Sequence, residues 1–592
     1  MKEMFSKLLV LFTSKEKKKF LILFVMMIFA AILETIGIGL IIPLVTIITN
    51  PESVQDQVIF RSIYEGLNFK SFNAFVIFSV LFLLSVFLIK NLYLLIFQYA
   101  QARVILNQQV KLSSQLFRSY LIQPYTFHMQ RNSADLLRNV NAEVPKLFQG
   151  IVMSGFQLFT EVLVILCILG LLVWTAPMAT LSASILLGIS VYAFFAILKG
   201  KLGNLGTEHQ RIGGAMIKSV NQGLGASKEV KVSGKEEFFI KSYTENGKIN
   251  SGIIRYLKLL EHVPRLFIET LLVAIVLMAM LIFVLQGKDT SEFITTMALF
   301  SMAAFRLMPS ITRVVAMLAT IRYSQPALDI VHDDLVSTKE YLKQNKEKDK
   351  NSQLNAANNK IYENAIELSG ISFRYPNQEG LAIKDVSLTI PIGQSVAFVG
   401  PSGAGKTTLV DIILGILEPH SGSLLVDSKK IEENLPLWQS RIGYIPQSIF
   451  LSDDTIRSNI AFGVEAEDID DTRVWRALEQ AQLMEFATSL PENIYTSVGE
   501  RGIKLSGGQR QRLGIARALY HNPEILFMDE ATSALDTETE KDIMSAIDRL
   551  KGEKTLIIIA HRLSTIENCD IVFKIENGRL VNTDKRDCKL VI

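Results

Sequence analysis

The chain has 592 residues, which is long enough for about three or four domains. Apolar residues make up 49% of it, and its formal net charge of +3 is too small to argue for nucleic acid as a partner. The three cysteines, Cys167, Cys569 and Cys588, lack metal-ligand spacing and are too few for a disulfide framework.

Residues 1–20 form the first recognisable element. They mix apolar residues such as Phe5 and Leu8 with lysines and end in a basic run from Lys15 to Lys19. This pattern predicts an amphipathic helix on the cytoplasmic membrane surface, with a solvated tail as the alternative. The apolar run that follows is longer than a signal-peptide core, and no small-residue cleavage site comes after it, so we expect no cleavable signal.

Six apolar runs are each long enough to cross a bilayer as a helix. They lie near residues 20–48, 72–99, 144–174, 178–198, 263–285 and 292–318. The intervening segments 101–143 and 199–262 are rich in lysine and arginine, so the positive-inside rule places both in the cytoplasm. Both ends of the chain are then cytoplasmic.

The two cytoplasmic segments are expected to be helices that continue below the membrane, because structureless loops of this length are unusual. Breaks at Gln123-Pro124 and at 223–225 predict short transverse elements near 125–136 and 226–237, where the chain could touch a cytoplasmic domain. The mostly polar stretch 333–360 predicts a linker. We therefore expect three parts: a transmembrane domain at 1–332, the linker at 333–360 and a cytoplasmic domain at 361–592.

A glycine-rich loop in the second half fits the phosphate-binding pattern G-x-x-x-x-G-K-[ST]. The apolar run 395–399 predicts a strand before it, and 409–414 predict a helix after it. In that setting backbone N–H groups and the helix N-terminus bind phosphate, which a chance glycine-rich turn would not do. Lys406 would reach the β- and γ-phosphates and Thr407 would hold Mg²⁺. The residues assigned to the loop are Gly400, Ser402, Gly403, Gly405, Lys406, Thr407 and Thr408.

Other candidate residues lie at the ends of predicted elements. Tyr375 is an aromatic residue that could stack on a nucleobase or simply pack. A helix predicted over 510–520 begins after a second candidate anion site, made of Ser506, Gly507, Gly508 and Gln509. The apolar strand 525–530 ends in Asp529, placed to hold Mg²⁺, and Glu530, placed to polarise a water. The strand 555–560 ends at His561, which could contact the γ-phosphate. Each of these residues alone could be structural; their order along the chain argues for function.

Together these motifs resemble those of ABC ATPases. The matching residues are 400–407 for Walker A, Gln447 for the Q-loop, 505–509 for the signature, Asp529-Glu530 for Walker B, His561 for the switch histidine and 496–502 for the X-loop of exporters. With six spans ahead of them, the chain resembles an ABC exporter half-transporter. The resemblance implies a polytopic α-helical membrane domain, with six transmembrane helices of the domain-swapped exporter type. This domain is fused to an α/β P-loop NTPase domain of ABC type.

The resemblance also implies a homodimer that uses ATP and Mg²⁺. In such a dimer Ser506, Gly507 and Gly508 of one chain complete the site whose Lys406 and Glu530 belong to the other chain. Gln447 would be a Mg²⁺ ligand and a catalytic residue together with Glu530 and His561. The resemblance also places the protein in the bacterial inner membrane, as a multi-pass protein with its ATPase domain in the cytoplasm.

The membrane half resembles bacterial lipid-linked oligosaccharide flippases at 34–35, at Pro43 and at 305–310. We also predict that four cations within or near the spans hold an anionic headgroup: Lys90, Arg265, Arg306 and Arg313. Arg306 and Arg313 are seven residues apart on one helix face, roughly 10 Å. Charges in spans usually face a cavity or a partner, and forked arginine donors match phosphate. Snorkelling to cytoplasmic headgroups, or an Arg265–Glu269 pair, is the alternative.

These observations predict an ATP-driven flippase for a lipid-linked oligosaccharide with an anionic pyrophosphate group. Its partners would be a second copy of the chain and the lipid-linked saccharide or another membrane lipid, with no nucleic acid. An exporter of drugs, peptides or phospholipids would share every ATPase motif, and a gated channel or regulator could share the architecture. The six spans exclude a soluble ABC ATPase of DNA repair or translation.

Overall fold

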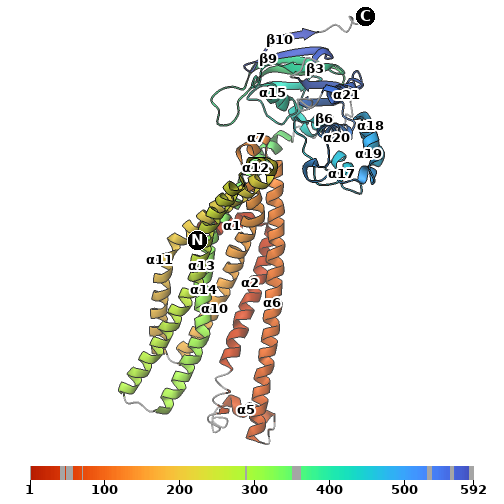
Figure 1. Ribbon diagram of the computed structural model, residues 1–592. Coiled ribbons are helices and arrows are strands. Elements are labelled where there is room, and N and C mark those ends of the chain that lie inside the picture. Colours follow the sequence, from red (N-terminus) through yellow and green to blue (C-terminus); the bar gives the residue numbers. More distant parts are fainter. Residues whose placement is uncertain are drawn as a thin grey trace. The chain divides into compact units, whose positions relative to one another are not determined.

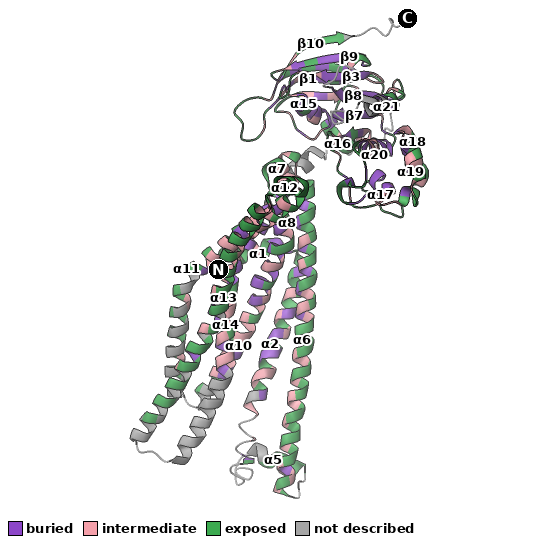
Figure 2. Ribbon diagram, in the orientation of Figure 1, coloured by how far each residue is buried: buried purple, intermediate pink, exposed green. Residues whose placement is uncertain are grey.

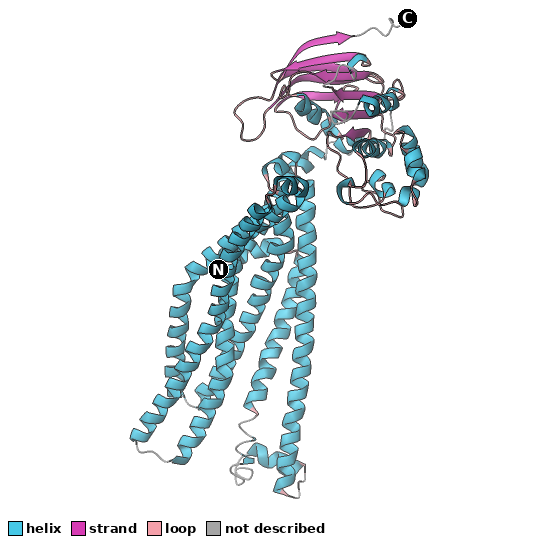
Figure 3. Cartoon of the chain, in the orientation of Figure 1, coloured by secondary structure: helices cyan, strands magenta, loops and turns pink. Residues whose placement is uncertain are grey.

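The computed structural model describes residues 2–585 apart from 41–43, 45–46, 49–57, 68, 70, 176, 287–289, 350–361, 530–536 and 561–565. The chain divides into two compact units. One comprises Met1–Gln123 with Arg131–Glu340, and the other Pro124–Gln130 with Tyr341–Ile592. The described part of the first unit is helical, whereas the second combines strands and helices (Figure 3).

The first unit is built from long helices (Figure 1). Its elements are α1 (Lys2–Leu11), α2 (Ser14–Gly39), α5 (Val58–Gly66), α6 (Phe72–Ile122), α8 (Ser133–Arg138), η1 (Asn139–Glu143), α9 (Val144–Leu147), η2 (Phe148–Met153), α10 (Ser154–Thr175), α11 (Pro177–Gly225), α12 (Ser227–Ser233), α13 (Glu236–Gln286) and α14 (Thr290–Asp349). Helix α2 lies between α6 and α10 and packs against both. The π-helical turns η1 and η2 flank α9, so α8 to α10 form one nearly continuous rod.

The N-terminal helix is shorter than its amphipathic pattern predicts. Helix α1 ends at Leu11, and Glu16 accepts a 2.7 Å hydrogen bond from the Thr13 backbone N–H at the start of α2. Glu16 is buried and pairs with Lys111 of α6 at 2.6 Å. The lysine run therefore opens the first spanning helix instead of closing the surface helix, because a local cap starts a new helix there.

Three helical stretches among the described residues are long and apolar enough to cross a membrane: Ser14–Gly37, Phe72–Ile122 and Ser133–Gly170. The other three predicted spans fall within α11, α13 and α14, whose side chains are described only in part. The apolar side of α6 is open in the chain, with Leu88 64% and Ile89 65% exposed (Figure 2). Surface of this kind is stable against lipid, so α6 presents it to the bilayer.

The cytoplasmic ends of the helices largely follow the sequence prediction. Helix α6 ends at Ile122, before Pro124, and α11 ends at Gly225, so both expected breaks are present. The transverse elements are the short helices α8 and α12 of the first unit and α7 (Tyr125–Gln130) of the second. Helix α14 continues into the predicted linker as far as Asp349, and the rest of the linker, 350–360, lies outside the described residues. Residues 333–349 contain no glycine or proline and many lysines and glutamates, which favour helix despite their polarity.

The second unit contains two sheets. Its strands are β1 (Ala365–Phe373), β2 (Ile383–Pro391), β3 (Ser395–Val399), β4 (Ser421–Val426), β5 (Lys429–Lys430), β6 (Ile442–Ile445), β7 (Ile525–Asp529), β8 (Thr555–Ile559), β9 (Ile571–Glu576) and β10 (Arg579–Lys585). The four-stranded sheet has the order β2-β1-β4-β5 and is antiparallel. The six-stranded sheet has the order β10-β9-β3-β8-β7-β6 and is parallel except for β10.

The helices of the second unit are α15 (Lys406–Ile413), η4 (Ile431–Glu433), α16 (Leu435–Ser440), α17 (Ile456–Ile460), α18 (Asp471–Gln480), α19 (Met484–Ser489), η5 (Asn493–Tyr495), η6 (Glu500–Gly502), α20 (Gly507–Leu519) and α21 (Thr537–Asp548). The parallel sheet is buried on both faces, with α15 packed in one apolar core and α20 in the other. In β3, Val396 and Phe398 join the apolar core that contains α15, whereas Ala397 joins the core that contains α20. Burial on both faces explains why these strands are continuous apolar runs.

The first strand of the second unit contains an irregularity. The apolar residues at 366–368 and 371–373 are separated by two residues, yet one strand, β1, runs through both groups. A bulge between Leu368 and Ile371 absorbs the extra residues, and Gly370 there has a φ of +62°. Glycine adopts this backbone conformation without strain, so the apparent break in the pattern is a bulge.

Candidate functional site

The phosphate loop lies between β3 and α15, as its motif predicts. Lys406 is the first residue of α15, and Gly405 caps the helix with a φ of +104°. A Cβ atom on Gly405 would lie 2.8 Å from Ile383 Cδ1 and 3.0 Å from the Ala382 carbonyl oxygen. Glycine is therefore required here both for its backbone conformation and for space. The helix N-terminus is left open toward the loop, where it can attract an anion.

Lys406 points back over its own loop. Its ammonium donates hydrogen bonds to the carbonyl oxygens of Gly400 and Pro401, at 2.9 and 3.1 Å, and the residue is only 5% exposed. These contacts hold a cation beside the backbone N–H groups of the loop. A phosphate bound there would meet a fixed positive charge that the protein has already partly desolvated.

Tyr375 lies beside the phosphate loop although it is distant from it in sequence. Its hydroxyl lies 2.9 Å from the Thr408 hydroxyl of α15, and its ring meets Phe373 edge-on at 5.0 Å. Burial raises the pKa of the Tyr375 hydroxyl, so the group stays a neutral hydrogen-bonding partner. An aromatic ring is thus fixed next to the loop, where a base could stack on it.

Two carboxyl groups near the phosphate loop influence each other electrostatically. Asp529, at the end of β7, is 7% exposed, and Asp411 lies in α15. Burial, with the nearby Asp529 carboxylate as the second cause, raises the pKa of Asp411 to about 6. The same two causes raise the pKa of Tyr444 to about 12. The sequence analysis did not select Asp411; its signal was an acid inside the apolar run 409–413.

The oxygen-bearing residues predicted to hold Mg²⁺ come from neighbouring elements. Thr407 lies in α15, Asp529 ends β7, and Gln447 follows β6, which pairs in parallel with β7. No group of three His, Cys, Asp or Glu residues suited to a metal occurs among the described residues. A hydroxyl, an amide oxygen and one carboxylate nevertheless fit Mg²⁺, which takes its remaining ligands from phosphate and water. Together with the loop cation, this donor set suits Mg²⁺-ATP.

The second candidate anion site is the start of α20. This helix begins at Gly507, earlier than the predicted residue 510, because Ser506 caps it. The Ser506 backbone N–H donates to Gln509 Oε1 at 2.8 Å, and the Gln509 backbone N–H donates to Ser506 Oγ at 3.2 Å. A Cβ on Gly507 would meet nothing within 4 Å, so this helix N-terminus is open on that side. It can receive an anion from outside the chain.

Two predicted catalytic residues, Glu530 and His561, lie outside the described residues. The elements that lead to them are described. Asp529 pairs with Ile559 across β7 and β8, and the Ala560 N–H donates to the Phe398 carbonyl oxygen at 3.1 Å. The strand ends that carry the two residues therefore meet at the edge where β3 enters the phosphate loop.

The four predicted substrate cations have different surroundings. The Arg313 guanidinium forms a forked ion pair with Glu161 of α10, at 2.5 and 3.0 Å. Lys90 lies 4.6 Å from the Phe87 ring centre and against Gly37 of α2, and Arg265 is exposed. The Arg306 side chain lies outside the described part. The sequence analysis missed Glu161, because nothing local connects it to a residue 152 positions away.

Comparison with known proteins gives consistent matches over both halves. Residues 18–308 match the family described as "ABC transporter transmembrane region", and 383–533 match "ABC transporter". The "ATP-dependent lipid A-core flippase" of Cupriavidus pinatubonensis is 30% identical over 486 residues, or 80% of this chain and 78% of that protein. The protein of the same name from Saccharophagus degradans is 31% identical over 487 residues, with 80% and 78% covered.

A solved structure described as a bacterial Atm1-family ABC exporter with ATP bound also matches the chain. Its TM-score is 0.74 at 22% sequence identity, and the match covers 96% of this chain and 95% of the other. At that identity the likeness establishes the fold. The helical bundle and the ATPase unit thus occur together in the other protein along nearly its full length.

Proposed function

Since the chain belongs to the ABC transporter family, as an exporter with its membrane and ATPase domains in one polypeptide, we propose that it flips a lipid-linked oligosaccharide from the inner to the outer leaflet. The chain is a membrane protein with a cytoplasmic ATPase that couples ATP hydrolysis to transport. We place it in the bacterial inner membrane and propose that it works as a homodimer with Mg²⁺-ATP.

The main support for a lipid substrate is the similarity of the chain to flippases. Relatives that are 30–31% identical over four-fifths of the chain are named for flipping lipid A-core. An alignment of this length must include the membrane half as well as the ATPase half. This favours a glycosylated lipid over a drug or a peptide. Arg313 supports an anionic headgroup, because its fork is already oriented toward a carboxylate and could take phosphate oxygens in the same geometry.

We assign the ATP chemistry to residues around the phosphate loop. Lys406 and the loop amides bind the phosphates, and Tyr375 stacks on the base. Thr407, Gln447 and Asp529 hold Mg²⁺, which neutralises phosphate charge when bound. Glu530 orients and polarises the attacking water, with His561 close to the γ-phosphate. Ser506 to Gln509 of the second chain close the site through the open N-terminus of α20.

Two ATP molecules held between the ATPase domains would favour the closed dimer, and their hydrolysis would release it. Closing the cytoplasmic side around the headgroup would then expose it to the outer leaflet while the acyl chains stay in the bilayer. In this cycle Lys90, Arg265, Arg306 and Arg313 receive the headgroup at the inner leaflet. Arg306 lies deepest by its place in the sixth predicted span, so snorkelling explains it least.

The test is flipping of a fluorescent lipid-linked oligosaccharide in proteoliposomes, with and without ATP. The variant Arg306→Ala/Arg313→Ala should abolish flipping while detergent-solubilised protein keeps its basal ATPase activity, and Arg306→Lys should recover flipping only in part. Unimpaired flipping by the double variant would remove the cationic site. Stimulation of ATPase activity by drugs or peptides alone would support the alternative, an exporter of those compounds.

A further inference from the structure

The loop that follows Gln447 is fixed to α20, the helix that Ser506 caps. Ile449 packs directly on Gly514 of α20, where an added Cβ would lie 2.3 Å from Ile449 Cδ1. The next residue, Phe450, accepts a 2.7 Å hydrogen bond at its carbonyl oxygen from Nη1 of Arg517, one helical turn beyond Gly514. Two successive loop residues therefore contact the same face of α20.

Arg517 uses the rest of its guanidinium group to join a third element. Its Nε donates to the Asn459 carbonyl oxygen at 2.7 Å, and its Nη2 donates to Asn459 Oδ1 at 3.0 Å. Asn459 is fully buried in α17, and its side chain exchanges hydrogen bonds with Ser452 through the Ser452 N–H and carbonyl, both at 3.0 Å. The Phe462 ring lies 4.7 Å from the guanidinium carbon. The loop, α17 and α20 are thus held together by one side chain.

This arrangement connects the Gln447 site with the Ser506 site through α20. Gln447 follows the end of β6, beside the Asp529 strand, whereas Ser506 is eleven residues before Arg517 on α20. A rigid helix carries a displacement over that distance, about 16 Å, without loss. If Gln447 moves when nucleotide binds, the loop must either break its bonds to Arg517 or take α20 with it.

We propose that Arg517 is a positioning residue that makes the Gln447 loop and the signature helix move as one body. Nucleotide bound beside Gln447 then sets the position of Ser506 and Gly507 against the nucleotide of the second chain. Arginine suits this role because its planar fork binds two separate carbonyl groups and the Asn459 amide at once. The inference rests on the proposed roles of Gln447 and Ser506 in the nucleotide site.

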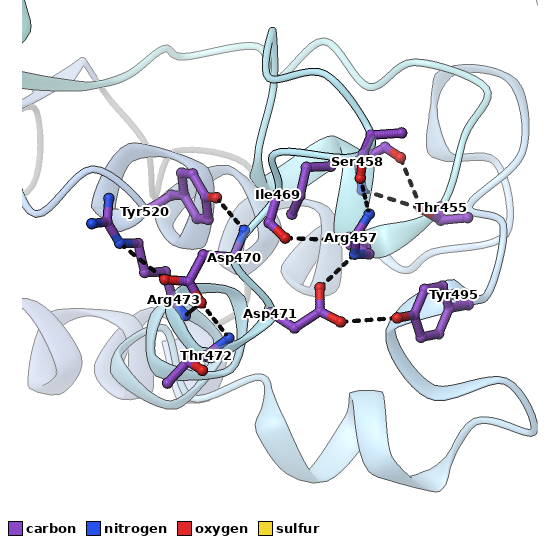
Figure 4. Close-up of polar contacts among 11 residues, drawn as sticks. Thr455, Arg457, Ser458, Ile469, Asp470, Asp471, Thr472, Arg473, Tyr495 and Tyr520 are labelled. Atoms are coloured by element: carbon purple, nitrogen blue, oxygen red, sulfur yellow. Dashed lines mark hydrogen bonds and ion pairs between the residues drawn. The ribbon is translucent and has the colours of Figure 1, made fainter.

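Arg457 provides a matched control in the same part of the domain. It lies on α17, two residues before Asn459, and donates to Asp471 Oδ1 at 2.5 Å and to the carbonyl oxygens of Ala466 and Ile469, both at 3.0 Å (Figure 4). Asp471 also accepts a hydrogen bond from the Tyr495 hydroxyl. Arg457 thus makes three hydrogen bonds, as Arg517 does, but their acceptors lie at 466–471, outside both the Gln447 loop and α20.

The experiment compares Arg517→Lys with Arg457→Lys in the full-length dimer, by ATPase kinetics and thermal unfolding. An ammonium cannot span the three acceptors of either arginine, so both variants should lose Tm. Only Arg517→Lys should lower kcat, by about tenfold, with KM for ATP within about twofold of the parent, because nucleotide binding at Lys406 is untouched. Equal kcat losses at equal Tm losses would overturn the positioning role.

Two further variants keep the outcome decisive. If Arg517→Lys does not fold, Ile449→Ala weakens the packing of the same loop on Gly514 of α20 and should also lower kcat; normal kcat overturns the proposal. Gln447→Ala separates this inference from the proposed site. Normal activity in Gln447→Ala overturns the role of Gln447 and, with it, the positioning role of Arg517. Impaired activity in Gln447→Ala together with normal activity in Arg517→Lys overturns the positioning role alone. A double variant no slower than Gln447→Ala supports a shared route.

Discussion

Replacing Glu161 by glutamine should strengthen the response to an anionic lipid, because it releases Arg313 from its ion pair. The pair is forked, with distances of 2.5 and 3.0 Å, and joins α10 to α14 where Val164 and Ile311 are buried. The Glu161 side chain is 15% exposed but Arg313 is 44% exposed. Solvent or headgroup access therefore screens the interaction, and its strength lies between those of exposed and buried pairs, about 1–2 kcal/mol.

In the parent protein an anionic headgroup must overcome this ion-pair energy to bind Arg313. Removing the ion pair in Glu161→Gln should therefore lower the half-saturating lipid concentration about 5- to 30-fold. The assay is ATPase stimulation in nanodiscs doped with a pyrophosphate-linked saccharide lipid, with a zwitterionic lipid as the reference. The control variant, Arg313→Gln, should raise the half-saturating lipid concentration. It removes the cation and leaves the Glu161 carboxylate, which repels an anionic headgroup.

The direction of the two shifts decides between a binding role and a structural role. A pair that only holds α10 against α14 would lose the same contact in either variant, so both would be impaired alike. Parallel losses of stimulation, with no change in half-saturation, would refute the reasoning and leave Arg306 as the sole deep cation of the proposed site.

Three other predictions concern the nucleotide site. Glu530→Gln should bind ATP and accumulate as a closed dimer with turnover reduced about 10²–10⁴-fold, and near-normal steady-state hydrolysis would contradict its role as base. Ser506→Arg should block closure of the dimer without preventing ATP binding. Mixed dimers of Ser506→Arg with Lys406→Ala should regain partial activity, because they keep one intact site. Full activity of Ser506→Arg alone would exclude a shared site. Tyr375→Ala should raise KM for ATP about tenfold by removing base stacking. Tyr375→Phe, which loses only the hydrogen bond to Thr408, should stay near the parent, and equal KM changes would argue against stacking.

Much of the nucleotide site could be predicted because its chemistry is local in sequence. The strand 395–399 is found at the expected residues, and the next helix begins at Lys406, where the loop needs a helix N-terminus. Glycine spacing, an apolar strand and a following helix all lie within about twenty residues, and each constrains the others. The capping box at Ser506 was also visible in the sequence as a serine followed three residues later by glutamine, although the helix start was placed too late.

The errors lie where local preference and composition point in different directions. The stretch 333–349 is polar enough for a linker, but its residues favour helix and α14 already supplies the nucleus, so extension costs little. At Lys15 to Lys19 the charge pattern suggests a surface helix, yet Glu16 caps a new helix and pairs with Lys111 of α6. Such a pair depends on the packing of distant segments, and no periodicity reveals it.

Arg313 and Arg517 act at different stages of the proposed cycle. Arg313 meets Glu161 within the membrane domain, so we expect changes in this pair to alter how tightly the proposed lipid is held. Arg517 meets Phe450 within the ATPase domain, so we expect its substitution to alter how fast a bound nucleotide is used. A lesion in binding shifts half-saturation, whereas a lesion in coupling lowers the maximum rate at every lipid concentration. Lipid stimulation curves of the Arg313 and Arg517 variants should therefore differ in shape. Each contact is made by tertiary packing within its own unit of the chain.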